Sequence, residues 1–173
     1  MAGVFAVICA LDINLTDVLE GLEHLSTPKR RGNVVEATVD TVGQVTLIDS
    51  TYNANPLSMK AALKSLKSKR GRKVAILADM LEQGPTSAES HKNLLADVQQ
   101  SGIVQVVTVG KEMQNLWYVL PDELRAKTFA DVGELLNADP AEYLKEGDVV
   151  LVKGSGATHL KRWFSKYTNY TSE

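Results

Sequence analysis

The sequence predicts an α/β fold in which a mostly parallel sheet carries helices on both faces, preceded by a β-hairpin and a short helical segment. Three short and nearly continuous apolar runs support this prediction, because the strands of a parallel sheet are buried on both faces. These runs are "KVAILA" at 73–78, "IVQVVTVG" at 103–110 and "DVVLVKG" at 148–154. Helical patterns and short loops alternate with them, which implies right-handed β–α–β crossovers.

The first part of the chain reads as a separate helical unit. Residues 3 to about 24 have the pattern of two short helices and end at "STPKRRGN", where composition and periodicity both change. We therefore predict a helical unit over 1–27, a linker over 28–32 and a main domain over 33–173.

The main domain begins with a predicted hairpin and a helix. "VVEATVD" and "QVTLID" flank a turn at 41–43 and have the pattern of two paired strands. The helix that starts at Pro56 spaces its apolar residues at i, i+3, i+4 and i+7, so that one stripe faces a core. These residues are Met59, Ala62, Leu63 and Leu66.

The rest of the domain continues the alternation of strands and helices. Thr86 and Glu89 have capping-box spacing ahead of a helix that runs to about Gln100 and is closed by Gly102. The remaining expected elements are a helix to Leu120, a short strand "KTFA", a helical segment at 131–145 broken at Pro140, and a helix from about Ser155 to Tyr167.

Composition argues against several classes of function. The 173 residues carry a formal net charge of −2, which gives no bulk electrostatic basis for binding nucleic acid or an anionic membrane. Cys9 is the only cysteine, which excludes an internal disulfide and fits the reducing cytoplasm. The apolar opening carries Asp12, lacks a basic start and is shorter than the roughly 20 residues that span a bilayer, so we expect no membrane insertion.

Candidate ligand-binding residues are expected in four loops. Ligands of parallel sheets bind in the crevice beyond the carboxyl ends of the strands. The loops predicted at that edge are "DSTYNANP", "ADMLEQGP", "GKEM" and "KGSGATH".

The first of these loops, 49–56, mixes helix-start residues with residues suited to a ligand. Asn55 and Pro56 fit the N-cap and the first position of a helix. Asp49, Tyr52 and Asn53 place a carboxylate, an aromatic face and an amide next to that helix N-terminus, where backbone N–H groups favour anions. A carboxylate can bind a ribose hydroxyl or a metal, and a tyrosine can stack on a purine. Structural and ligand-binding roles both stay open for this cluster.

The other loops offer charged groups with two interpretations each. Lys153 and Ser155 flank a glycine between an apolar strand and a helix, an arrangement that can cradle an anion. The alternative is a glycine-assisted turn with a surface lysine, and no Walker A pattern is present. Asp79, with Glu82 three residues on, can receive an amine or a metal, or can cap a loop.

Arg31 and His91 are weaker candidates on sequence alone. Arg31 in "PKRR" reads as a solvated linker cation or as a group that reaches phosphate, and His91 as a solvated or hydrogen-bonded helix residue. The sequence has no HExxH, GxSxG, GxGxxG or catalytic Cys–His signature. A covalent nucleophile and a dinucleotide-binding loop are therefore not expected.

Taken in order, these segments resemble the carboxy-terminal third of the Mur ligases. The resemblance rests on "TPKRRG", "LIDSTYNANPLSMKAAL", "KVAILADMLEQG" followed by "SAESH", and "VVLVKGS", and it covers nearly the whole chain. It implies that 1–27 is the truncated helical end of a central ATPase domain and that 28–32 is a hinge. Residues 33–173 would then be a Rossmann-like carboxy-terminal domain that packs on its own ATPase domain.

The resemblance is greatest to the member that adds D-Ala-D-Ala to UDP-MurNAc-tripeptide in a cytoplasmic step of peptidoglycan synthesis. In that family ATP phosphorylates the tripeptide carboxylate, and the amine of the dipeptide attacks the acyl phosphate with release of ADP and phosphate. Mg²⁺ offsets the charge on the transferring phosphoryl group. ATP and Mg²⁺ would be bound mainly by the ATPase domain, whose phosphate loop and metal ligands these residues lack. The resemblance thus implies no catalytic residue and no metal ligand within the chain, which alone is expected to be inactive.

Matched position by position, the resemblance implies two groups of site residues. Those facing the nucleotide would be Arg31, Asp49, Tyr52 and Asn53, and those facing the substrates would be Asn55, Asp79, Lys153 and Ser155. The chain departs from the family at three places: Arg30 and Ala78 stand where glycine is usual, and Gly156 stands where an arginine commonly follows Lys–Gly–Ser.

Two other functions are compatible with the same scaffold. One is a non-catalytic α/β binding module, because a fold alone does not fix a function. The other is a sibling amide ligase of the folylpolyglutamate synthase or cyanophycin synthetase type. The Tyr–Asn–Ala–Asn–Pro element argues against the sibling ligases.

Overall fold

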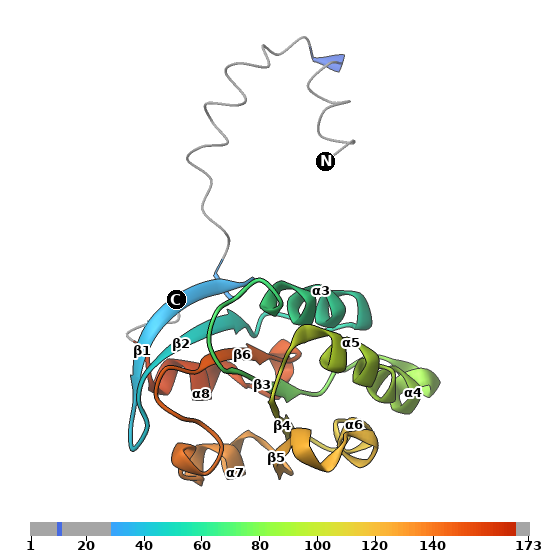
Figure 1. Ribbon diagram of the computed structural model, residues 1–173. Helices are drawn as coiled ribbons and strands as arrows, with labels where there is room; N and C mark the ends of the chain where they lie inside the picture. The colour runs from blue at the N-terminus through green and yellow to red at the C-terminus, as the bar shows by residue number, and fades with distance from the viewer. Residues whose placement is uncertain (1–9, 12–28, 169–173) are drawn as a thin grey trace.

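The computed structural model describes residues 10–11 and 29–168 (Figure 1). The helices predicted between residues 3 and 24, and with them the helical unit at 1–27, lie almost wholly outside the described residues. Within the described residues, no helix is both long and apolar enough to cross a membrane.

The domain is built on one six-stranded sheet with the strand order β1-β2-β6-β3-β4-β5. The predicted hairpin is confirmed, since β1 and β2 pair in antiparallel fashion. The other neighbours, β2·β6, β6·β3, β3·β4 and β4·β5, are all parallel, which confirms the mostly parallel sheet. The strands are β1 (Asn33–Val39), β2 (Gly43–Ser50), β3 (Lys73–Ala78), β4 (Gln105–Val109), β5 (Arg125–Phe129) and β6 (Val149–Lys153).

Helices cover both faces of this sheet, as predicted (Figure 1). One apolar core joins α3, α5 and α6 to one face, and a second core joins α7 and α8 to the other. The helices are α3 (Pro56–Leu66), α4 (Ser87–Lys92), α5 (Leu94–Ser101), α6 (Gln114–Val119), α7 (Val132–Asn137) and α8 (Lys161–Lys166).

The central strand β3 shows why the apolar runs are uninterrupted. Ala75 and Leu77 belong to the core under α3 and α5, whereas Val74 and Ile76 belong to the core under α8. Successive side chains of a strand point to opposite faces, and here both faces are covered. The buried positions of this strand, 74–78, are therefore all apolar.

Two helix starts differ from the prediction. The capping box at Thr86 is wrong: its hydroxyl donates to the carbonyl of Gln83 at 3.0 Å, and no side chain caps α4. A 3₁₀ turn at Gly84–Thr86, with a proline fixing its first positions, leads directly into α4. The last helix also starts later than Ser155, because His159 adopts a left-handed conformation with φ of 59°.

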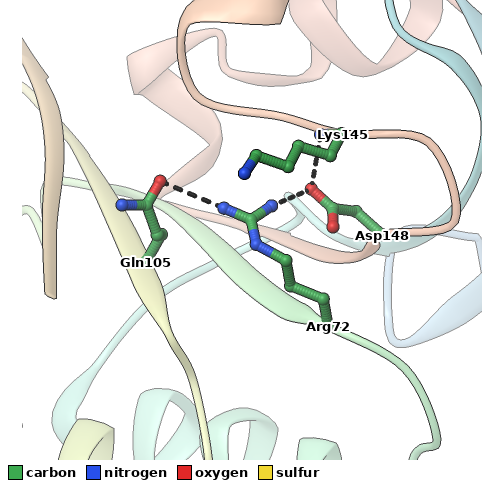
Figure 2. Close-up of polar contacts among 4 residues, drawn as sticks. All are labelled: Arg72, Gln105, Lys145 and Asp148. Carbon is green, nitrogen blue, oxygen red and sulfur yellow. Dashed lines mark hydrogen bonds and ion pairs between the residues drawn. The ribbon is translucent and has the colours of Figure 1, made fainter.

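A buried ion pair ties three strands together at the amino edge of the sheet (Figure 2). Arg72 donates from Nη1 to Asp148 Oδ2 at 2.5 Å and from Nη2 to Gln105 Oε1 at 3.1 Å. The backbone N–H of Lys145 donates to the same Asp148 oxygen at 2.8 Å. Asp148 is fully buried, and its Oδ1 has no hydrogen-bond partner among the described residues.

Replacing Arg72 with methionine is expected to lower the free energy of unfolding by about 3 kcal/mol, because it leaves a buried carboxylate without its cation. Adding Asp148→Asn should restore part of that loss, since asparagine is uncharged and can still accept the Lys145 N–H. Urea unfolding followed by tryptophan fluorescence measures both variants. Equal midpoints for the single variant and the parent would show that this pair contributes little.

Candidate ligand-binding site

The strand order brings the predicted loops to one edge of the sheet. In the register of the sheet, Lys153 of β6 lies opposite Ser50 of β2 on one side and Leu77 of β3 on the other. The segments that follow these strands therefore start side by side.

A pocket of about 500 Å³ opens beside the end of β2 and the first turns of α3. Five of the eight predicted site residues line it: Arg31, Tyr52, Asn53, Asn55 and Lys153. The other three, Asp49, Asp79 and Ser155, do not line it. Five predicted residues therefore face the same pocket, and the contacts of the other three have to be described one by one.

The start of α3 is fixed by a reciprocal cap, which confirms the helix-start interpretation of Asn55 and Pro56. Asn55 Oδ1 accepts the N–H of Ser58 at 2.8 Å, and Ser58 Oγ accepts the N–H of Asn55 at 3.0 Å. The sequence analysis missed Ser58, although its spacing of three from Asn55 is the signal of a capping box. The cap holds the loop 51–55 rigidly against the pocket.

The ring of Tyr52 lies against two arginines of the segment before β1. The tyrosine residue is 48% exposed, and the guanidinium carbons of Arg31 and Arg30 lie 4.5 and 5.5 Å from the ring centre. The N–H of Tyr52 also donates to the carbonyl of Arg30 at 3.3 Å. Guanidinium groups are attracted to the face of an aromatic ring at such distances. The pocket mouth thus combines a half-exposed tyrosine with two positive charges over its ring.

Lys153 places a buried cation in the wall of the pocket. Lys153 is 4% exposed, and its Nζ donates to the carbonyl of Asn53 at 2.8 Å. Burial lowers the pKa of this ammonium from 10.5 to about 8. No carboxylate pairs with it in the part of the chain that the structure describes. A buried ammonium group that no carboxylate of the described residues neutralises is suited to bind an anionic ligand.

Asp49 lies on the other side of β2 from the pocket. Its neighbours Ile48 and Ser50 line the pocket, and side chains alternate along a strand. Asp49 Oδ1 accepts the N–H of Thr51 at 3.0 Å and the hydroxyl of Thr51 at 2.8 Å. Burial raises the pKa of this carboxyl, although the Thr51 bonds act in the opposite direction. In this structure Asp49 stabilises the turn after β2.

Asp79 is occupied by the segment that leads into α6. Asp79 is 8% exposed, and its Oδ1 accepts the N–H of Met113 at 2.8 Å. The carboxylate fits against Gly110, where any side chain would overlap it. Burial raises the pKa of Asp79, and the bonds to the backbone at 112 and 113 partly offset that rise. The loop-capping interpretation therefore describes its contacts.

Ser155 connects three of the loops. Its Oγ accepts the N–H of Leu81 at 3.0 Å and donates to the carbonyl of Ala54 at 3.3 Å, and its own N–H donates to the carbonyl of Asp79 at 3.1 Å. These bonds hold the segments after β2, β3 and β6 in one frame around the pocket.

Comparison with known proteins decides the family. Residues 30–156 match the family described as Mur ligase, glutamate ligase domain, and this match covers well over half of the chain. The chain belongs to the Mur ligase family.

Individual Mur ligases agree with this assignment. Curated UDP-N-acetylmuramoyl-tripeptide–D-alanyl-D-alanine ligases of Rickettsia prowazekii and Treponema pallidum are 30% and 32% identical to the chain, over 95% and 92% of its length. The chain spans only 36% and 34% of those proteins.

Solved MurF structures share the fold. A crystal structure of MurF from Acinetobacter baumannii matches 94% of the chain with a TM-score of 0.76 at 29% identity, and the match covers 35% of that protein. MurF from Thermotoga maritima, in complex with ADP, matches 92% with a TM-score of 0.71 at 26% identity, again over 35% of its length. These likenesses confirm the Rossmann-like architecture expected for the carboxy-terminal domain of a Mur ligase.

The three departures from the Mur ligase pattern have local physical consequences. Arg30 has a φ of 65°, a left-handed conformation that suits the usual glycine and costs other residues about 1–2 kcal/mol. Its stacking on Tyr52 offsets part of that cost. A Cβ at Gly156 would lie 2.8 Å from the carbonyl oxygen of Tyr52, so the usual arginine does not fit this arrangement of the loops.

The third departure, Ala78, packs directly against Gly154. A Cβ at Gly154 would lie 2.6 Å from the Cβ of Ala78, closer than two carbon atoms can approach. Gly154→Ala is therefore expected to destabilise the domain by about 1–3 kcal/mol through overpacking. The double variant Ala78→Gly with Gly154→Ala moves the methyl group from the end of β3 to the residue after β6. It should recover part of that loss, because the new Cβ still lies 3.3 Å from the Cα of residue 78 and 3.2 Å from Thr158 Oγ1. Thermal unfolding measures both, and a lack of recovery would contradict the contact.

Proposed function

We propose that this chain is the carboxy-terminal domain of the ATP-dependent ligase that adds D-Ala-D-Ala to UDP-MurNAc-tripeptide in cytoplasmic peptidoglycan synthesis. The observation that carries the proposal is the pocket that Arg31, Tyr52, Asn53 and Lys153 line together. The names of its Mur ligase relatives support the substrates. Within this proposal, 1–27 ends the central ATPase domain and 28–32 is the hinge.

The pocket residues fit a nucleotide on one side and an anionic substrate group on the other. ATP supplies the phosphoryl group that activates the tripeptide carboxylate. The half-exposed ring of Tyr52 is suited to stack on the purine once Arg31, which lies over that ring, turns to a phosphate. Lys153 and Asn55 form the side of the pocket that we assign to the incoming dipeptide. There the buried ammonium group of Lys153 binds the carboxylate of the dipeptide.

The groups that perform the phosphoryl transfer are assigned to the rest of the ligase. Among residues 10–11 and 29–168, no group of three His, Cys, Asp or Glu residues is placed to hold a metal ion. Within this proposal, which follows the resemblance to the Mur ligases, Mg²⁺ and most of the ATP contact belong to the ATPase domain. The isolated chain should release no phosphate from ATP, Mg²⁺, UDP-MurNAc-tripeptide and D-Ala-D-Ala above the blank, and clear turnover would contradict this division.

Titration of ADP into the isotopically labelled chain tests the nucleotide assignment. We expect the largest amide shifts at Arg31, Tyr52 and Asn53, with weak affinity because only half of the site is present. Arg72 and Gln105 at the opposite edge of the sheet provide internal controls and should not shift. Shifts confined to that opposite edge would overturn the nucleotide assignment.

A further inference from the structure

His91 is a buried histidine whose two ring nitrogens are both committed to backbone groups. It lies in α4 and is fully buried. Its Nε2 accepts the N–H of Met80 at 3.0 Å, and its Nδ1 lies 2.7 Å from the carbonyl oxygen of Ser87. These partners assign the neutral tautomer with the proton on Nδ1, which donates to Ser87. The imidazole thereby links α4 to the segment that follows β3.

We propose that His91 is a positioning residue that holds the loop 79–83 so that Glu82 meets the ammonium group of the incoming dipeptide. This inference rests on the proposed function. It gives a role to His91 and Glu82, neither of which lines the pocket.

The loop is held from two sides. His91 binds the N–H of Met80, and Ser155 Oγ binds the next N–H, that of Leu81, at 3.0 Å. Ser155 also donates to the carbonyl of Ala54, which adjoins the Asn53 carbonyl bound by Lys153. These hydrogen bonds, together with the peptide units between them, therefore connect α4 through this loop to the wall of the pocket.

Glu82 is the acidic side chain of this loop that remains available. Asp79 is nearly buried and accepts the Met113 N–H, whereas Glu82 is exposed and its carboxylate has no partner among the described residues. Glu82 also has a φ of 62°, a left-handed conformation that non-glycine residues keep only where neighbouring contacts impose it. The two anchored N–H groups directly before it supply those contacts. An exposed carboxylate on an anchored backbone, without a partner among the described residues, is suited to a primary ammonium group.

The first test measures the hydrogen bond itself. Amide hydrogen exchange at Met80 and Leu81 should become at least tenfold faster in His91→Phe, which fills the space without an acceptor. It should stay close to the parent in His91→Gln, whose amide offers both an acceptor and a donor. Lys92→Gln, an exposed position of the same helix, is the matched control. Unchanged exchange at Met80 in His91→Phe would overturn the positioning role.

The second test uses steady-state kinetics of the full-length ligase. Glu82→Gln and His91→Phe should each raise KM for D-Ala-D-Ala roughly tenfold or more, as expected for the loss of a charged hydrogen bond, and leave KM for ATP unchanged. His91→Gln should recover most of the affinity. The double variant should lose no more than Glu82→Gln alone, because the histidine acts through that carboxylate.

The outcomes separate this inference from the proposed function. A parent ligase without D-Ala-D-Ala-dependent turnover would overturn both. An active parent whose His91→Phe variant keeps its KM for D-Ala-D-Ala, or whose double variant loses the product of the two single effects, would overturn the positioning role alone.

Discussion

Replacing Lys153 with methionine in the full-length ligase is expected to lower kcat/KM for D-Ala-D-Ala roughly 10- to 100-fold, the range for a lost hydrogen bond to a charged group. The reason is the position of the ammonium group, buried in the pocket wall with a backbone carbonyl as its protein partner. Lys69→Met, at an exposed lysine after α3, is the matched control and should leave kcat/KM unchanged.

The pH dependence of this effect follows from the lowered pKa of Lys153. The ammonium of the free domain loses its proton near pH 8, so the advantage of the parent over Lys153→Met in kcat/KM should shrink above pH 8. The ratio of the two enzymes is the quantity to measure, because the amine of the dipeptide titrates equally in both. A ratio that is flat from pH 7 to about 9.5 would contradict a role for the charge.

Lys153 should favour kcat/KM but lower the free energy of unfolding at neutral pH. Its folded-state pKa of about 8 lies below the unfolded value of 10.5, so the unfolded chain binds the proton more tightly between these values. The parent therefore loses stability as pH falls from 10.5 to about 8, and the loss is complete below 8. Lys153→Met should be at least as stable as the parent at pH 7, with a difference that shrinks toward pH 10.5.

Replacing Tyr52 with alanine is expected to weaken ADP binding by the full-length ligase roughly tenfold, because stacking of a base on an aromatic ring contributes about 1–3 kcal/mol. Tyr52→Phe should bind like the parent, since the phenol oxygen forms no hydrogen bond among the described residues and the ring is retained. Calorimetric titration with ADP measures both variants.

Two results would contradict the assignment of Tyr52 to the nucleotide. The first is equal ADP affinity in Tyr52→Ala and the parent. The second is a rise in KM for D-Ala-D-Ala in Tyr52→Ala without a change in KM for ATP, which would assign this side of the pocket to the dipeptide.

The fold was predictable because both faces of the sheet are covered. The uninterrupted apolar run at 73–78 indicates a strand buried on both sides, and the structure has β3 at those residues. The start of α4 was not predictable from Thr86 and Glu89, because a 3₁₀ turn that begins at Gly84 enters the helix without a side-chain cap. Local spacing cannot distinguish these two starts.

The grouping of residues around the pocket was predictable where they are neighbours in sequence. Tyr52, Asn53 and Asn55 lie within one loop, so their common orientation follows from the strand that ends at Ser50. Asp79 and Ser155 depend on partners that are distant in sequence, such as Met113 for the first and Leu81 for the second. Contacts of this kind depend on the assembled sheet and leave no pattern in the sequence around either residue.

Asp49 differs, because the sequence did contain the information. Residues of a strand alternate between faces, and Ile48 and Ser50 share the pocket side. A carboxylate between them points to the opposite side, where it binds Thr51. Asp49 is close to Tyr52 in the sequence but does not share the pocket with it.

Phosphate release by the full-length ligase with different amines tests the central claim most directly. With ATP, Mg²⁺ and UDP-MurNAc-tripeptide present, we predict that phosphate release requires D-Ala-D-Ala and that L-glutamate does not replace it. Phosphate release that depends on L-glutamate, or that is the same without any amine, would contradict the assignment of this chain to a D-Ala-D-Ala-adding Mur ligase.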